Sequence, residues 1–241
     1  MRIAQFKSPF TRHVRAATVK QLLNHLAKHH GADEKLAGEI SRHHLPKPRN
    51  VTATKEERAL MLSKSHPALK CWLLLCSDLA IRSGTAAMLG PDDYDKRERT
   101  LTFQTKYSNR QVLRVTSELA EMLDTCKDAS KPFVAQFARG KHWRGGATLQ
   151  PIGRMTRSAL YDAFTVVKKE CGITRKLTPH DLRRTTARFI YKHTGDMRTA
   201  QALLGHSQLA STVWYLQDAM EEVSISSLEL AKLNTITEVV Q

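Results

Sequence analysis

The chain has 241 residues, of which 41% are hydrophobic, and this suits one large domain, or one domain with a smaller one, around an apolar core. A formal charge of +15 at pH 7 and a pI of about 9.9 favour an extended polyanionic partner, nucleic acid in preference to an anionic membrane. No apolar run reaches membrane-spanning length and the first ten residues lack the apolar core of a signal peptide, so we expect a cytoplasmic protein without membrane association.

The chain has no sequence pattern of a metal or nucleotide site. Its four cysteines form no Cys-x-x-Cys pair, which argues against a zinc module and against a disulfide framework. It also lacks the GxxxxGK[ST] loop that cradles phosphates in nucleotide hydrolases. We therefore expect no metal ion and no cofactor.

Residues 1–48 are expected to form a basic helical segment. The first fifty residues hold ten Lys or Arg residues against three acids, and apolar residues recur at helical spacing between positions 17 and 28. Two prolines and several polar residues then break the pattern, as is typical of a linker between domains. We place that linker at residues 49–54.

Helical patterns dominate residues 55–216. The segments TLTFQTK and QVLRVT, on either side of YSNR, instead alternate apolar and polar residues, which predicts a β-hairpin. The expected fold class is therefore mainly α with a small antiparallel β-sheet. The expected helices cover residues 55–64, an apolar stretch from Pro67 towards Arg82, and residues 117–126, 157–171, 179–193 and 197–204.

The helix expected over residues 179–193 has a strong start signal. Thr178 can cap it, proline suits its first position, and Asp181 completes a Thr-x-x-Asp capping box. His180 and Arg183 then project together from the first turn, where backbone N–H groups also favour an anion. Taken alone, such a His-x-x-Arg pair is more often a capping or core histidine beside a solvated face of arginines than a phosphate site.

Other segments carry residues of related chemistry. Arg82 lies in LAIRSGTAAMLG, Lys106 stands beside the hairpin turn, and LLGHSQLASTVWYLQ places His206 nine residues before Tyr215. The order Arg, Lys, His-x-x-Arg, Gly-His, Tyr, with the local patterns HDLRR and LLGHS, resembles the tyrosine recombinase (phage integrase) family over roughly residues 51–220. The resemblance implies an integrase-type catalytic domain, known as the DNA breaking-rejoining fold.

The family resemblance implies a site-specific DNA recombinase that acts through a covalent 3′-phosphotyrosine. Tyr215 would be the nucleophile, and because a tyrosine hydroxyl has a pKa of about 10, His180 would assist as its base. Lys106 would give a proton to the departing 5′ oxygen. Since the intermediate retains the bond energy, neither a metal ion nor ATP is required.

The same resemblance assigns the remaining site residues to the scissile phosphate. Arg82 and Arg183 would clamp it, because a planar guanidinium matches the geometry of phosphate oxygens. His206 would donate a further hydrogen bond. The chain departs from the family pattern around Arg82, where A-I-R-S-G-T has no preceding glycine and has Thr85 in place of the common glutamate.

The resemblance also implies a domain organisation and an assembly. Residues 1–48 would be a partial or minimal core-DNA-binding domain, since they are about half the size that a four-helix domain needs. Residues 55–216 would be the catalytic domain, and residues 217–241, with five acids and one lysine, would dock on a neighbouring protomer. The expected assembly is a homotetramer on double-stranded DNA with inverted-repeat core sites, assisted by accessory DNA-bending proteins.

Within this resemblance the expected role is integration or excision of a phage or mobile element, and two other functions stay open. A type IB topoisomerase uses the same chemistry and relaxes supercoils without exchanging partners. A DNA-binding accessory protein keeps the fold without cleaving DNA. Relaxation without site preference would favour the topoisomerase, and DNA binding without any covalent product would favour the accessory protein.

Overall fold

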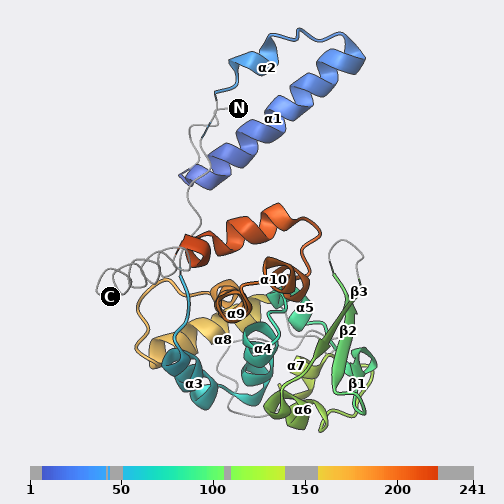
Figure 1. Ribbon diagram of the computed structural model, residues 1–241, viewed down its shortest axis with the longest axis vertical. Helices are drawn as coiled ribbons and strands as arrows, with labels where there is room; N and C mark the ends of the chain where they lie inside the picture. The colour runs from blue at the N-terminus through green and yellow to red at the C-terminus, as the bar shows by residue number, and fades with distance from the viewer. Residues whose placement is uncertain (1–6, 42, 44–50, 106–109, 139–156, 222–241) are drawn as a thin grey trace, which may run out of the picture. The chain divides into compact units, whose positions relative to one another are not determined.

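In a computed structural model, the chain divides into two units, Met1–Arg49 and Asn50–Gln241. The structure describes residues 7–41, 43, 51–105, 110–138 and 157–221 (Figure 1). Among these residues, no helix is both long enough and apolar enough to cross a membrane.

The first unit contains a long helix, α1 (Pro9–His30), that packs against a short one, α2 (Leu36–Glu39). The helix α1 begins earlier than the apolar spacing predicted, because Ser8 caps the backbone N–H of Thr11 and a proline follows at the first helical position. It ends at Gly31, whose φ of 69° is the left-handed conformation typical of a helix C-terminus.

The second unit is built around α4 (Pro67–Ser77), an apolar helix that lies among the other helices of this unit (Figure 1). Nearly every residue of α4 is buried, as expected for a helix that is apolar all round. The helix α3 (Lys55–Lys64) packs on α8, and α10 (Met197–Leu204) packs on α9. The helices that contact α4 are α5 (Ser83–Ala86), α6 (Ser117–Leu123), α7 (Phe133–Gln136), α8 (Arg157–Glu170) and α9 (Pro179–Thr194).

The sheet of this unit is antiparallel and contains the predicted hairpin. Its order is β1 (Tyr94–Asp95), β2 (Thr100–Gln104), β3 (Arg110–Arg114), with a short 3-10 helix, η2 (Pro91–Asp93), leading into β1. Leu101 and Phe103 of β2 are buried in the core. The predicted fold class, mainly α with a small antiparallel sheet, is confirmed.

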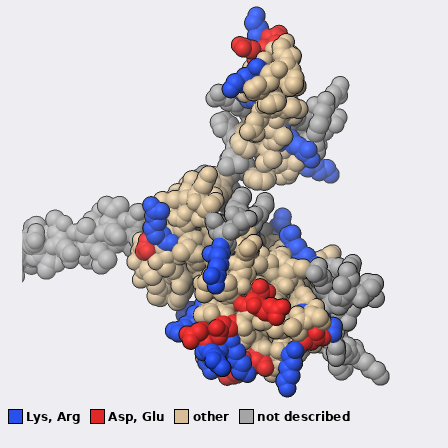
Figure 2. Space-filling view, turned by 90° about the vertical axis from the view of Figure 1, so that its right-hand side faces the viewer, with Lys and Arg blue, Asp and Glu red and all other residues tan. Residues whose placement is uncertain are grey.

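Charged side chains of both signs share the surface of the second unit. On the face shown in Figure 2, Lys and Arg side chains lie among Asp and Glu side chains over the lower part of the molecule.

The end of α4 differs from the sequence prediction. The apolar pattern predicted a helix that leads to Arg82, but α4 ends at Ser77, and Arg82 instead precedes the first residue of α5. Thr186 of α9 donates to the carbonyl of Ser77, and Ala80 adopts a left-handed φ of 49°. The N–H of Ile81 then bonds back to the carbonyl of Leu75 at 3.1 Å, so a left-handed turn closes the helix before its apolar pattern ends.

The left-handed turn predicts how a glycine at position 80 behaves. Ala80→Gly removes a left-handed cost of about 1–2 kcal/mol. The substitution also lowers the free energy of unfolding by about 0.8 kcal/mol, because a buried methyl group is lost. It lowers it by up to about 1 kcal/mol more, because glycine gives the unfolded chain more conformational freedom. We expect the free energy of unfolding, measured by urea denaturation, to change by less than about 1 kcal/mol.

The matched control is Ala163→Gly, a buried alanine inside α8. This substitution should cost about 1.5–2 kcal/mol, because it loses helix propensity and methyl burial without relieving a left-handed residue. Equal losses at the two positions would contradict the left-handed turn.

Candidate active site

The N-terminus of α9 is formed as the sequence predicts. Thr178 and Asp181 make the capping box, and the backbone N–H of Thr178 donates to Asp181 Oδ2 at 2.8 Å. Pro179 is the first residue of α9, so the side chains of His180 and Arg183 project from the first turns of the helix. His180 is exposed, whereas Arg183 points inward and is only 3% exposed.

The arginines of α9 do not form a solvated face. Arg183, Arg184 and Arg188 are 3%, 7% and 9% exposed, so the alternative interpretation of this stretch is wrong for all of them. The Nη1 atom of Arg183 donates to the carbonyl of Ala80, and its Nη2 atom donates to the carbonyl of Leu204. Arg183 thus fastens the turn before Arg82 to the end of α10.

Burial lowers the pKa of Arg183 to about 10, so its guanidinium stays charged near neutral pH. Although His180 is exposed on part of its surface, desolvation of the covered part, followed by the charges of Arg183 and Arg184, lowers the pKa of His180 as well. The imidazole of His180 is therefore held in its neutral form and can accept a proton.

Tyr215 lies on a helix over residues 209–221 and is buried against α9, with 8% of its surface exposed. Its hydroxyl donates to the backbone carbonyl of His180 at 3.1 Å. Its ring meets the rings of His180 and His206 edge-on, at centroid distances of 5.3 and 5.8 Å. Burial raises the pKa of Tyr215 to about 12, and the positive charge of Arg183 opposes that increase.

The helix that carries Tyr215 is fastened to α9 by charge as well as by packing. Arg188 Nη1 lies 3.9 Å from Asp218 Oδ2. Leu216, next to Tyr215, is fully buried in a cluster with Ala187 of α9 and Leu204 of α10. The position of Tyr215 therefore depends on contacts with both helices.

His206 follows the C-terminus of α10 directly. Gly205 ends that helix with a left-handed φ of 54°, and the side chain of Gln201 donates to the carbonyl of His206 at 2.9 Å. Thr212 is fully buried, and its hydroxyl lies 3.0 Å from Nδ1 of His206, which fixes the ring. Burial, with the charges of Arg183 and then Arg82, lowers the pKa of His206 to about 4, so the ring is neutral at pH 7.

Arg82 immediately precedes α5 and is partly buried. Its backbone carbonyl accepts from the N–H of Ala86 at 2.8 Å, but its side chain makes no hydrogen bond or ion pair with another residue that the structure describes. Its charge nevertheless contributes to the lowered pKa values of His180, Arg183 and His206, which places it in the same cluster. The structure therefore brings Arg82, His180, Arg183, His206 and Tyr215 together, whereas Lys106 lies outside the described residues.

Sequence reasoning missed two side chains of this cluster. The guanidinium of Arg184 lies 4.8 Å from the centre of the Tyr215 ring, a cation–π contact, and its Nε and Nη1 atoms are buried without a hydrogen-bond partner among the described residues. Thr212 fixes the ring of His206. The only sequence signal was proximity, because Arg184 adjoins Arg183 and Thr212 precedes Tyr215 by one helical turn.

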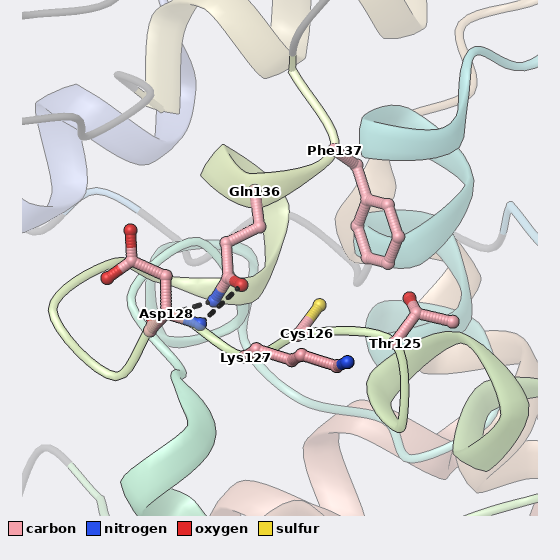
Figure 3. A pocket seen from close by; sticks show the side chains of 6 residues that line it. All are labelled: Thr125, Cys126, Lys127, Asp128, Gln136 and Phe137. Atoms are coloured by element: carbon pink, nitrogen blue, oxygen red, sulfur yellow. Dashed lines mark hydrogen bonds between the residues drawn. The ribbon is translucent and has the colours of Figure 1, made fainter.

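A pocket of about 380 Å³ between the end of α6 and α7 contains none of these residues. Figure 3 shows Gln136 turned towards the backbone of Asp128, which it holds by hydrogen bonds of 3.1 and 2.9 Å. Hydrogen bonds from Lys131 and Ser130 lower the pKa of Asp128 to about 2, and burial raises that of Cys126 to about 11. Near neutral pH the Asp128 carboxylate is therefore only a weak base, and the Cys126 thiol stays protonated. The pocket is lined by Thr125, Cys126, Lys127, Asp128, Gln136 and Phe137.

Across the described parts of the chain, no group of three or more His, Cys, Asp or Glu side chains is placed to hold a metal ion. The chemistry that the cluster around Tyr215 offers is that of cations, neutral imidazoles and a phenol.

A sequence model of the Phage integrase family matches residues 50–222. The chain belongs to this family. The tyrosine recombinase XerD of Mycobacterium tuberculosis (strain ATCC 25618 / H37Rv) is 27% identical over 139 residues, which cover 56% of this chain and 42% of that protein. The chain spans about half the length, or less, of the first curated relatives that it matches.

Two solved structures share the fold of this family member. The XerA recombinase matches with a TM-score of 0.58 and 17% identity, covering 94% of this chain and 85% of that one. A lambda integrase(75-356) dimer bound to a COC′ core site matches with a TM-score of 0.64 and 18% identity, covering 86% and 73%. At these identities the likeness shows the fold alone.

The lowered pKa of His206 predicts a pH dependence of stability. Because the folded pKa of about 4 lies below the ordinary value of 6.5, the unfolded chain takes up a proton first as the pH falls. The stability that neutral His206 contributes is full above pH 6.5 and is lost towards pH 4. We expect the stability advantage of the wild type over His206→Gln, measured by urea denaturation, to shrink between pH 7.5 and pH 5. A constant difference over that range would contradict the burial of a neutral imidazole.

Proposed function

We propose that the protein is a tyrosine-type site-specific DNA recombinase that acts in the integration or excision of a phage or mobile element. The observation that carries the proposal is the cluster in which Tyr215 meets two neutral histidines and buried arginines from distant segments. A DNA substrate is supported by the charge of +15 and by the related lambda integrase dimer, whose structure was solved on a core site.

In the proposed cleavage step, Tyr215 Oη attacks the scissile phosphorus while the bond from phosphorus to the 5′ oxygen breaks. The proton of the hydroxyl passes to the imidazole of His180, and the departing 5′ oxygen receives a proton from Lys106. The product is a 3′-phosphotyrosine and a free 5′ hydroxyl. Attack by the 5′ hydroxyl of the partner strand then reseals the DNA and releases Tyr215, so no co-reactant is consumed.

The remaining residues act on the charge of the phosphate. Arg82 and Arg183 neutralise the nonbridging oxygens, whose negative charge would otherwise repel the nucleophile. His206, neutral at pH 7, has one ring N–H to donate to the same group. The hydroxyl of Tyr215 has to leave the His180 carbonyl before it can reach phosphorus.

The same proposal assigns roles to the outer parts of the chain. Residues 1–48 contact DNA backbone phosphates through their Lys and Arg side chains, which gives salt-dependent affinity without sequence readout. Residues 217–241 dock on a neighbouring protomer in a homotetramer on DNA. Residues 55–216 form the catalytic domain.

Covalent capture of DNA tests the proposed nucleophile. The substrate is DNA from the region that flanks the gene, chosen for inverted repeats. It carries a nick just 3′ of the presumed cleavage position and a label on the 5′ end of the cleaved strand. We expect wild-type protein to carry the label on a denaturing protein gel, because the short 5′-hydroxyl fragment diffuses away and prevents resealing. Tyr215→Phe should carry none, a loss of at least about 100-fold, because it lacks the attacking oxygen.

The control is Tyr191→Phe, a partly buried tyrosine that packs against the same cluster. It should form the covalent product at the wild-type level. Label on Tyr215→Phe would assign the chemistry to another residue. DNA binding with no covalent product from the wild type would favour a non-catalytic accessory protein, and relaxation of supercoils without site preference would favour a topoisomerase.

A further inference from the structure

Gln111, a residue of the sheet, holds the end of α10. The proposed chemistry gives this side chain no role. Gln111 lies on β3, where it pairs with Phe103 of β2, and is partly buried. Its side-chain Nε2 donates to the carbonyl of Ala202 at 3.0 Å and to the carbonyl of Leu203 at 2.7 Å. An amide NH₂ has two hydrogens, so both bonds can form at once.

These bonds complete the capping of α10. The last four carbonyls of a helix have no partner within the helix and need one elsewhere. Here the carbonyls of residues 201–204 accept from the backbone N–H groups of Gly205 and His206 and from the side chains of Gln111 and Arg183. Gln111 from the sheet and Arg183 from α9 therefore both satisfy carbonyls at the end of α10.

Gly205, which stands directly before His206, lies so close to the sheet that a side chain there would be crowded. A Cβ atom at Gly205 would lie 2.8 Å from Gln111 Oε1 and 3.0 Å from Cγ2 of Thr105, a buried residue that follows β2. The backbone that leads into His206 thus passes directly against the sheet. The side chain of Gln111 therefore confines this backbone on the side that faces the sheet.

We propose that Gln111 is a positioning residue for His206. It anchors the turn over residues 204–206 to β3, so that the imidazole keeps its edge-on position beside Tyr215 and its contact with Thr212. The inference rests on the proposed function for its catalytic consequence, but the placement of His206 can be measured in the protein alone. Gln111 itself touches none of the proposed reacting atoms.

The first test is an NMR titration of the His206 ring in the full chain without DNA, assigned by comparison with His206→Gln. In Gln111→Met, which keeps the length of the side chain and removes the donor, we expect the pKa of His206 to rise towards its ordinary value of about 6.5. Gln111→Asn, whose amide is one methylene short of the carbonyls, should behave in the same way. It keeps the test valid where the Met variant does not fold.

The matched control is Gln104→Met, an exposed glutamine on the neighbouring strand β2, which should titrate as the wild type. A pKa of His206 that is unchanged in the Met and Asn variants would overturn the inference. So would an equal rise in the Gln104 control, because the effect would then belong to the sheet in general.

The second test measures the rate of covalent product formation on the nicked DNA at saturating concentration. We expect Gln111→Met and Gln111→Asn to slow it by up to about 100-fold with little change in DNA affinity, because a misplaced side chain impairs the chemical step. Gln111→Lys should restore much of the rate, since an ammonium group can also donate to the last carbonyls of a helix. Equal rates in all variants would overturn the catalytic part of the inference.

The two tests separate the inference from the proposed function. A wild-type protein that forms no covalent product removes the proposed function, while the titration still decides whether Gln111 places His206. A wild-type protein that cleaves DNA, with a His206 insensitive to Gln111, leaves the function standing and removes the inference.

Discussion

The buried guanidinium of Arg183 is the group on which the arrangement of the site depends. A charge that is withdrawn from water costs several kcal/mol unless hydrogen bonds replace the lost hydration. The carbonyls of Ala80 and Leu204 supply that replacement. Leu204 ends α10, so its carbonyl lacks a partner within the helix, and the left-handed turn at Ala80 follows the end of α4. The two Nη atoms of Arg183 thus satisfy both carbonyls and bring Arg82 and His206 to the same place, while its Nε atom is buried without a hydrogen-bond partner among the described residues.

Concentrating cations at one point has an electrostatic consequence. Arg82, Arg183 and Arg184 disfavour further positive charge, which helps to keep His180 and His206 neutral. Such a cluster repels itself, and a bound phosphate diester would relieve that repulsion while occupying the position where charge develops during the proposed reaction. Two of these cations, Arg183 and Arg184, also oppose the rise in the pKa of Tyr215 that burial causes.

Local patterns predicted much of this structure because the relevant contacts are local. The capping box of Thr178 and Asp181, the glycine after α10 and the alternation of the hairpin each act within a few residues, and each is confirmed. Contacts between distant segments had no such signal. The carbonyl of Ser77 at the end of α4 accepts from Thr186, more than a hundred residues away along the chain, and the guanidinium of Arg183 donates to two carbonyls that no pattern marks. The order of residues identified Arg82, His180, Arg183 and His206, which meet around Tyr215, but it missed Arg184, which lies over the Tyr215 ring. The chemical roles of these side chains stay a prediction.

Hydrogen–deuterium exchange of Arg183→Lys, compared with the wild type in the absence of DNA, tests most directly whether one buried arginine assembles the site. A lysine keeps the charge but has no planar fork, so it cannot hold both carbonyls in the same geometry. The account predicts faster exchange in residues 79–86 and in residues 202–208, with no change in α8. Exchange that increases equally in residues 79–86, residues 202–208 and α8 would contradict it. So would exchange that stays unchanged in both residues 79–86 and residues 202–208.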